Sequence, residues 1–322
     1  MPTAARNNVD VLCAGLITVD HVCAPIAHIP AAGELVMTDR IELAVGGSAA
    51  NVGLDLRRLG RRVSIAGRVG DDVLGRHVAS VLGEEGALSD QITFSPTAPT
   101  ATTMVVNVRG EDRRFVHAAG ANTEFTGNEI SLDVVRRSRA IYVGGFGLNA
   151  RLSGENVARL FETARAAGVL TVLDVVVGGE DVGRMLEPVL SLTDLFVPNE
   201  DECRVITGLA DPADQARRFR ELGARCVVVT RGEKGAILCD ESRFVSMGAH
   251  AVEQVDATGG GDAFVAGYVH AHLDGQSPED CLQFGSTLGA SCVQSPGATT
   301  GVFRADQLAA FVNENRLPIT PL

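Results

Sequence analysis

Strand-like and helix-like patterns alternate along this 322-residue chain, and no other feature of the sequence restricts its fold as much. Short runs rich in β-branched residues predict strands, and most of them are separated by segments with helical spacing of apolar residues. The predicted strands are Val9–Ala14, Arg62–Ala66, Ile141–Val143, Leu170–Leu173, Asp194–Val197, Cys226–Thr230 and Ala236–Cys239, and the predicted helices are Ala49–Leu59, Asp72–Leu82, Glu155–Ala167 and Asp214–Leu222. This alternation predicts a mostly parallel sheet covered by helices on both faces, with ligands beyond the carboxyl ends of the strands.

Two segments break the alternation. Residues 100–120 predict two strands joined by the turn Arg109–Asp112, and Val22–Leu43 is extended, contains proline and lacks a helical pattern. We expect these segments to pair as a small β-sheet lid over the strand ends. The expected organisation is core at 1–21, lid segment at 22–45, core at 46–98, lid hairpin at 99–120, and core with nucleotide-binding and catalytic loops at 121–322.

Composition excludes several classes of partner. Lys plus Arg is 28 against 40 for Asp plus Glu, giving a net charge of −12, so a nucleic-acid partner is not expected. Asp20 interrupts the first hydrophobic stretch, and the amino terminus has no apolar leader, so we expect a soluble, cytoplasmic protein without a membrane span. The seven cysteines are scattered without a C-x-x-C pair, which predicts buried thiols rather than disulfides or a zinc cluster.

The stretch "DATGGGDAF", residues 256–264, places three glycines at the mouth of a predicted helix. Both common nucleotide motifs, the P-loop and G-x-G-x-x-G, are absent. Because Gly259–Gly261 have no side chains, their backbone N–H groups could nevertheless approach and bind an anion at the helix N-terminus. A carboxylate such as Asp262 would repel a phosphate unless it takes a proton from the attacking hydroxyl. The alternative is a simple turn, with Asp262 as a first-turn acid facing the helix dipole.

This stretch resembles the D-T-x-G-A-G-D signature of the ribokinase-like (PfkB) carbohydrate kinase family. A second signature of that family is matched by "GGSAANVGLDLRRLG", Gly46–Gly60, and the resemblance continues through "GRVGDDVLG", "YVGGFG", "PNEDE" and "VVVTRGEKGA". It covers nearly the whole chain. The resemblance implies a three-layer α/β/α sandwich with a mostly parallel central sheet and a small β-sheet lid, and ATP and Mg²⁺ as cofactors.

The resemblance also assigns roles to individual residues. Those expected at the sugar are Asp20, Gly46, Gly47 and Asn51. Those expected at phosphoryl transfer are Asp262 as general base and the amides of Gly259, Gly260 and Gly261 as an anion hole. Those expected at the nucleotide are Asn199, Thr230, Gly232 and Gly235, with Glu202 acting on magnesium through its waters and Asp256 beside a monovalent cation such as K⁺. Asn199 and Glu202 also fit a helix N-cap with its capping-box glutamate, and both roles can hold together.

The chain departs from the family pattern at three positions. Ala257 replaces the usual threonine, which removes a hydroxyl and weakens the expectation of a monovalent cation, and Gly260 replaces the usual alanine. Ser48 stands where ribokinases and kinases of phosphorylated sugars carry lysine, which favours a free sugar as substrate. Arginines of the lid hairpin are able to supply the missing charge for a phosphosugar; they are Arg109, Arg113 and Arg114.

The sequence therefore predicts an ATP-dependent kinase that phosphorylates a primary hydroxyl of a free sugar, ribose-like or fructose-like. A nucleoside kinase of the adenosine type is the alternative within the class, and a catalytically silent sugar-binding protein is the alternative outside it. Residues Gly46–Ala50 nearly match the G-x-S-x-G elbow of serine hydrolases but lack its last glycine. A lid strand leaves an edge or face that a second subunit could cover, so a homodimer is also expected.

Overall fold

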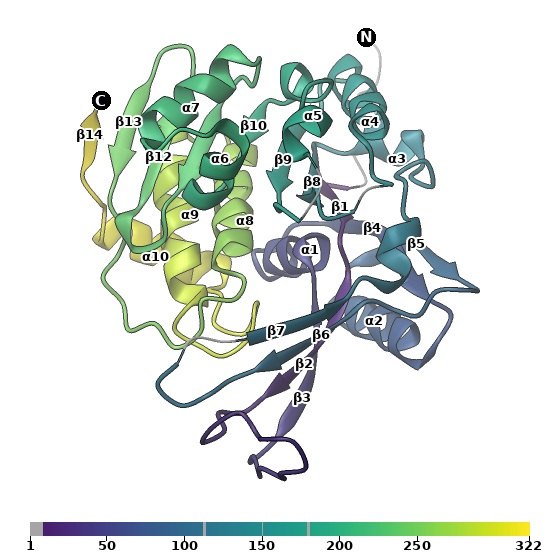
Figure 1. The fold of residues 1–322 in the computed structure, drawn as a ribbon. Coiled ribbons are helices and arrows are strands. Elements are labelled where there is room, and N and C mark those ends of the chain that lie inside the picture. The colour runs from purple at the N-terminus through teal and green to yellow at the C-terminus, as the bar shows by residue number, and fades with distance from the viewer. Residues whose placement is uncertain (1–8, 112–113, 150, 179–180) are drawn as a thin grey trace.

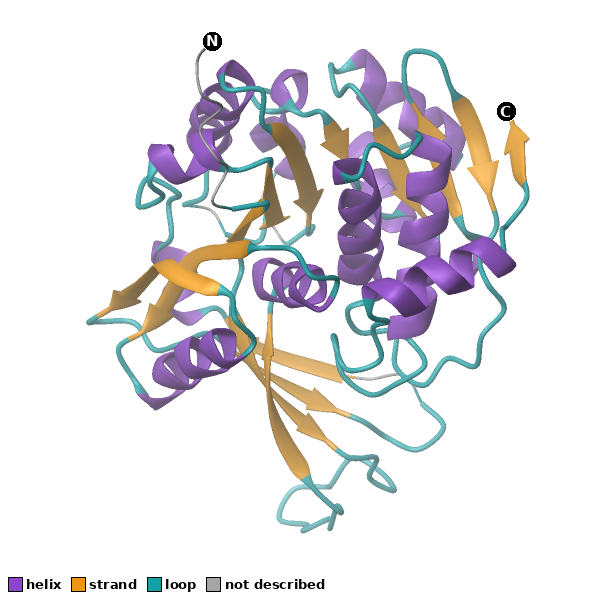
Figure 2. Cartoon of the chain, turned by 180° about the vertical axis from the view of Figure 1, so that it is seen from behind, coloured by secondary structure: helices purple, strands orange, loops and turns teal. Residues whose placement is uncertain are grey.

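The computed structural model describes residues 9–111, 114–149, 151–178 and 181–322. Its main feature is a ten-stranded sheet in the order β14-β13-β12-β11-β10-β9-β8-β1-β4-β5, with helices on both sides (Figures 1 and 2). Pairing is parallel from β5 to β11, and antiparallel from β11 through β12 and β13 to β14. The predicted α/β/α sandwich with a mostly parallel sheet is confirmed.

The strands of this sheet are β1 Val11–Gly15, β4 Val63–Gly70, β5 Leu88–Ser95, β8 Ala140–Phe146, β9 Leu170–Val175, β10 Leu195–Phe196, β11 Val227–Thr230, β12 Ala236–Cys239, β13 Phe244–Met247 and β14 Ile319–Pro321. The helices are α1 Ser48–Arg58, α2 Val73–Glu84, α3 Leu132–Arg137, α4 Gly154–Ala166, α5 Val182–Leu186, α6 Glu200–Thr207, α7 Pro212–Glu221, α8 Gly260–Leu273, α9 Pro278–Cys292 and α10 Ala305–Glu314. Short 3₁₀ turns lie at Gly120–Glu124, Leu190–Leu192 and Gly232–Lys234.

Two hydrophobic cores fill the spaces on either side of the large sheet. On β1, Val11 and Cys13 belong to one core and Leu12 and Ala14 to the other, because successive side chains of a strand point to opposite faces. The first core includes side chains of α1, α2, α8, α9 and α10, and the second includes side chains of α3 to α7. Burial on both faces explains why the strands are continuous apolar runs rather than alternating ones.

The lid is a separate four-stranded sheet in the order β3-β2-β6-β7, and it projects from one end of the molecule (Figure 1). Its strands are β2 Thr18–Cys23, β3 Ile41–Gly46, β6 Thr102–Val106 and β7 Arg114–Ala118. The predicted small sheet is therefore confirmed, but its first strand begins at Thr18, four residues before the expected lid boundary. The chain enters the lid soon after β1, since β2 begins three residues after Gly15. Val19 N–H donates to the Ala101 carbonyl at 2.9 Å, where β2 begins to pair with β6.

Two residues of the predicted lid turn and arginine cluster, Asp112 and Arg113, lie outside the described residues.

The structure also bears on the cysteines and on membrane spans. Of the seven cysteines, Cys23 and Cys226 are half-buried and the other five are buried. Within the described ranges, no helix has the length and apolar character needed to cross a bilayer.

Candidate active site

The three glycines form the N-terminus of α8. Gly259 caps the helix with a φ of 78°, and Ala263 N–H donates to its carbonyl at 2.8 Å. A Cβ atom at Gly259 would lie 2.2 Å from the Ala298 carbonyl oxygen, so both the backbone conformation and the close approach require glycine here. The amides of the first turn of a helix lack intrahelical acceptors, which makes this end of α8 suited to an anion.

Asp262 lies in that first turn and is held by α1. Asn51 Nδ2 donates to Asp262 Oδ2 at 2.8 Å, which links residues 211 positions apart in the sequence. Burial raises the pKa of Asp262 to about 6, and the hydrogen bond from Asn51 opposes this shift. A carboxylate with such a pKa is ionised at neutral pH and accepts a proton more readily than an ordinary aspartate.

Two further acids surround Asp262. Burial, followed by the charges of Glu202 and Asp262, raises the pKa of Asp174 well above its usual range, although the Tyr142 hydroxyl donates to Asp174 Oδ2 at 3.2 Å. Burial also raises the pKa of Glu202 to about 7, with a further contribution from Asp262. The sequence reasoning missed Asp174. It directly follows the predicted strand Leu170–Leu173, at the carboxyl end where ligands are expected to bind, so its position was an available signal.

This acidic cluster fits a hydrated cation. Asp262 raises the pKa of both Glu202 and Asp174, and a nearby positive charge would relieve this repulsion. Among the described residues, no group of three or more His, Cys, Asp and Glu side chains is arranged to hold a metal directly. Carboxylate oxygens are ligands that magnesium prefers, and magnesium also keeps several of its waters and takes phosphate oxygens as ligands.

The N-terminus of α6 brings Asn199 and Glu202 together. Asn199 Oδ1 accepts from the amides of Asp201 and Glu202 at 3.0 and 2.9 Å, and Glu202 Oε2 accepts from Asn199 N–H at 2.9 Å. The predicted capping box is thus present. It uses one oxygen of the Glu202 carboxylate and fixes the direction of the other.

A polar row crosses the inner face of the lid at Asp20. Asp20 pairs in register with Ala44 on β3 and Thr103 on β6, and Thr103 pairs with His117 on β7, so all four side chains share one face. Thr103 Oγ1 lies 3.1 Å from His117 Nδ1. Burial raises the pKa of Asp20, against hydrogen bonds from Thr18 and Thr103. The sequence reasoning found Asp20 but neither Thr103 nor His117, because they share its face only through strand register.

The glycine pair before α1 joins this row to Asp262. A Cβ atom at Gly46 would lie 2.3 Å from Asp20 Oδ2, and one at Gly47 would lie 2.5 Å from the Leu16 carbonyl oxygen. Gly47 caps α1 with a φ of 89°, and Asn51 follows in the first turn. Helix α1 begins directly after β3, and its Asn51 contacts Asp262 of α8. This one helix therefore connects the lid row of Asp20 with the glycine turn of α8.

Asp256 is saturated with hydrogen bonds. Its carboxylate accepts from Thr258 N–H at 2.8 Å, Thr258 Oγ1 at 2.6 Å and Gly297 N–H at 2.9 Å. The hydroxyl that Ala257 lacks is therefore supplied one position later. The Cys292 thiol donates to the nearby carbonyls of Thr258 and Ala298 at 3.5 and 3.1 Å. These contacts tie the loop after α9 to the start of α8.

A pocket of about 880 Å³ lies beside the glycine turn. Its wall includes Thr230, Gly232 and Gly235 after β11, and Gly260 and Gly261 of α8. An isolated bridge pairs Asn199 with Thr230, which places the α6 N-terminus next to this wall. The structure thus brings three of the four residues expected at the nucleotide to one cavity with two of the three anion-hole glycines, whereas Asn199 and Gly259 do not line it. The volume suits a nucleotide-sized ligand.

Comparison with solved structures identifies the fold. Arabidopsis thaliana ribokinase complexed with ribose and ATP superposes with a TM-score of 0.82 at 24% identity, covering 94% of this chain and 98% of that one. An E. coli protein described as a ribokinase II, in complex with ATP and Mg²⁺, gives a TM-score of 0.82 at 22% identity, covering 95% of this chain and all of that one. The chain has the ribokinase fold.

Sequence comparison then identifies the family. Ribokinase of Haemophilus influenzae is 27% identical over 316 residues, covering 95% of this chain and 99% of that protein. Fructokinase-2 of Solanum habrochaites is 26% identical over 271 residues, covering 79% and 83%. The profile of the pfkB family carbohydrate kinases matches residues 8–304. This chain belongs to the pfkB family and is a carbohydrate kinase, a phosphotransferase with an alcohol group as acceptor.

Proposed function

We propose that this enzyme transfers the γ-phosphate of Mg-ATP to a primary hydroxyl of a free, ribose-like or fructose-like sugar. One observation carries the proposal. Asp262 lies in the first turn of α8, directly after Gly260 and Gly261 in the wall of the 880 Å³ pocket. It also accepts a hydrogen bond from Asn51 in α1, the helix that follows lid strand β3. A base at that point is next to both a phosphate and a sugar hydroxyl.

In this proposal the residues of the chain divide the work between binding and proton transfer. Asp20 accepts hydrogen bonds from the sugar hydroxyls on the lid side, and Thr103 and His117 beside it supply further donors and acceptors. Asp262 takes the proton from the attacking hydroxyl. The amides of Gly259–Gly261 stabilise the transferring phosphoryl group.

The nucleotide side supplies the second set of contacts. Magnesium neutralises charge on the phosphate oxygens when bound. Glu202 and Asp174 face that charge, and Asn199 fixes Glu202 through the capping box. Thr230, Gly232 and Gly235 line the cavity proposed for ATP. The lid, residues 22–45 and 99–120 in the sequence-based organisation, covers the sugar and excludes water.

The decisive experiment is single-turnover transfer from ATP by Asp262→Asn. We expect kcat to fall by about 10²–10⁴-fold while sugar and ATP binding stay near normal, because the amide fills the same space but accepts no proton. Asp201→Asn is a matched control, since Asp201 is an acid in the first turn of α6 whose side chain pairs with Arg204. Near-normal turnover by Asp262→Asn would leave the aspartate as a helix-start residue only.

A substrate panel separates a sugar kinase from its alternatives. Sugars and nucleosides are each assayed for ADP release with Mg-ATP, and the proposal requires the highest kcat/KM for a free sugar. Preference for a nucleoside would favour the adenosine-type alternative, and binding without turnover of any compound would favour a silent sugar-binding protein.

Three finer expectations complete the proposal. A monovalent cation beside Asp256 stays a prediction, and the hydrogen-bonded state of that carboxylate gives it no support. A cytoplasmic location also stays a prediction. We further propose a homodimer through the outer face of the lid, defined by Ile41, Leu43, Met104 and Val116, which are 65%, 49%, 54% and 66% exposed. These four side chains lie opposite the polar row by strand register.

A further inference from the structure

The side chain of Asp55 is buried without a hydrogen-bond partner. It is 1% exposed, and neither carboxyl oxygen has a partner among the described residues. An ionised carboxylate in such a place loses its hydration without compensation, and buried acids respond by taking up a proton. Asp55 is therefore expected to be a neutral acid, which carries an O–H donor.

Asn51 lies one helical turn before Asp55. Residues four positions apart share a face of a helix, so both side chains project from the same side of α1. Asn51 donates its amide nitrogen to Asp262, but its Oδ1 is buried and lacks a partner in the described part of the chain. The same side of α1 thus holds three buried oxygens, Oδ1 of Asn51 and both carboxyl oxygens of Asp55. None of the three accepts a hydrogen bond from a described residue.

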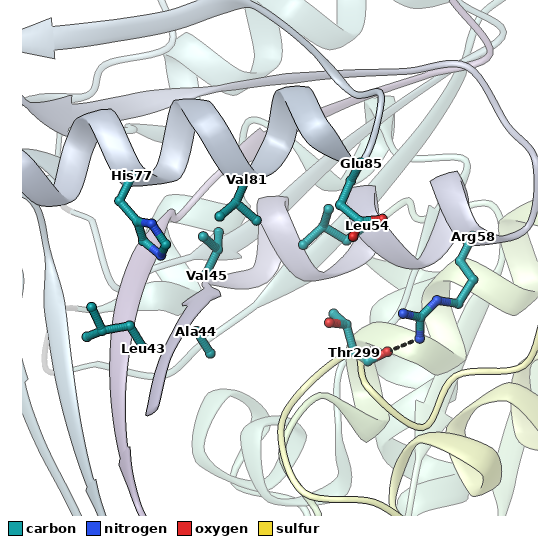
Figure 3. A pocket seen from close by; sticks show the side chains of 9 residues that line it. All are labelled: Leu43, Ala44, Val45, Leu54, Arg58, His77, Val81, Glu85 and Thr299. Carbon is teal, nitrogen blue, oxygen red and sulfur yellow. Dashed lines mark hydrogen bonds between the residues drawn. The ribbon is translucent and has the colours of Figure 1, made fainter. Parts of the chain in front are cut away.

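The charged and titratable groups around Asp55 do not resolve this mismatch. Arg58 donates to the backbone carbonyls of Thr299, Thr300 and Val302, and Figure 3 shows its guanidinium directed to Thr299 at the edge of a hollow of about 200 Å³. The Cys292 thiol is engaged with two other carbonyls, and Asp262 is itself an acceptor.

We propose that Asp55 is protonated in the folded enzyme and that its hydroxyl donates to Oδ1 of Asn51, which makes Asp55 a positioning residue for Asn51 and, through it, for Asp262. One proton satisfies both residues. It also fixes the amide so that its oxygen faces Asp55 and its nitrogen faces Asp262. Burial, followed by the charge of Asp262, raises the pKa of Asp55 well above its usual range against the effect of Arg58, which agrees with this arrangement.

The inference rests on the proposed role of Asp262, and it predicts how Asp262 titrates. The hydrogen bond from Asn51 lowers the pKa of Asp262. If Asn51 loses its anchor at Asp55, that hydrogen bond weakens and the pKa of Asp262 rises. The charge of Asp262 also raises the pKa values of Asp174, Glu202 and Tyr142, and these three groups are retained when position 55 is substituted.

The experiment compares Asp55→Asn with Asp55→Leu in pH profiles of kcat. Asparagine keeps a donor for Asn51, so its acid limb should coincide with that of the wild type. Leucine has no donor, so its acid limb should move to higher pH by roughly half a unit or more. If Asp55 were ionised instead, Asp55→Asn would remove a negative charge near Asp262 and lower its pKa. A shift of the acid limb of Asp55→Asn to lower pH would therefore overturn the inference. An unmoved limb in a folded Asp55→Leu variant overturns it as well.

Thermal unfolding tests the protonation of Asp55 without any activity. An acid whose pKa is raised by folding binds more protons in the folded state, so its contribution to stability falls as pH rises above the unfolded value of about 4. Asp55→Asn should therefore raise the Tm more at pH 8 than at pH 5, and an equal change at both pH values would contradict a neutral Asp55. Failure of the wild type to phosphorylate any sugar would refute the proposed function, and this measurement would still stand.

Discussion

At the scale of single residues, Asp262 is the side chain whose ionisation should be visible in the reaction. A general base works only in its ionised form, so activity is lost as pH falls through its pKa. Since burial raises the pKa of Asp262 to about 6, we expect kcat to rise with pH through that value and to level off above it. The measurement is kcat at saturating substrates between pH 5 and 8. A profile that stays flat down to pH 5 would contradict this assignment.

The glycine triplet offers a test with its own control. Gly259→Ala should abolish measurable activity, because a positive φ costs a non-glycine residue about 1–2 kcal/mol and the new Cβ would meet the Ala298 carbonyl oxygen at 2.2 Å. Gly261→Ala should leave the Tm unchanged, since no described protein atom lies within 4 Å of its Cβ position, and a loss of kcat in this variant would then report crowding of the phosphate. Gly260→Ala is intermediate, with Val293 Cγ1 at 3.0 Å, and it should lower activity only mildly. The kcat values of the three variants, with Tm as a folding check, decide the order.

At the scale of secondary-structure elements, the N-terminus of α6 combines a cap with a proposed magnesium contact. Glu202→Gln keeps the capping box, because glutamine also accepts from the Asn199 amide, but it removes the charge that faces the cation. We expect an unchanged Tm and a higher magnesium requirement, with little change in the sugar KM. The measurement is activity against free Mg²⁺ at saturating ATP and sugar. Identical magnesium dependence in variant and wild type would remove Glu202 from the site.

The lid is a second element with a measurable response. If sugar binds against Asp20 and the lid closes over it, amide hydrogen exchange in Val22–Leu43 and in the hairpin Thr102–His117 should slow when sugar is added. Strands β8 and β9 of the large sheet are the internal control, because their exchange should not depend on sugar. Equal exchange in the lid with and without sugar would contradict its role as a cover.

The elements show why part of this site could be predicted from the sequence and part could not. Asp262, Asn199 and Glu202 lie in local motifs at helix starts, where spacing along the chain fixes the chemistry. The positions of these three residues at helix N-termini could therefore be predicted from the sequence. His117 depends instead on strand register, since it reaches the row of Asp20 only through the pairing of β6 with β7. Asp174 depends on the tertiary fold, which brings the end of β9 within range of the charges of Glu202 on α6 and Asp262 on α8.

The short strands of the large sheet illustrate the same limit. Strands β5, β13 and β14 escaped the sequence reasoning because they are edge or near-edge strands with weak apolar runs, and β14 has only three residues. Strand pairing, rather than intrinsic preference, stabilises such segments. The seven predicted strands all have buried apolar centres, and they lie in the interior of the sheet.

At the scale of the whole molecule, the outer face of the lid gathers exposed apolar side chains, with His21 between Leu43 and Met104 in the same row. The inner face carries Asp20, Thr103 and His117, whereas the outer face carries Leu43, Met104 and Val116, with 49%, 54% and 66% of each outer side chain exposed. Contiguous apolar patches on a protein surface mark sites of association. A second copy of this chain would present the same face, and a two-fold interface is self-complementary.

We therefore expect the enzyme to be a dimer that one charge on the outer lid face dissociates. Val116→Asp places a carboxylate in the proposed interface, where its desolvation and the repulsion across a two-fold axis both oppose association. Val205→Asp on α6 is the matched control, since Val205 is 67% exposed against 66% for Val116 and the added charge is the same. Light scattering at micromolar concentration should give a dimer for wild type and control and a monomer for Val116→Asp. A monomeric wild type, or a dimer in all three, would place any association of this protein elsewhere than on the outer lid face.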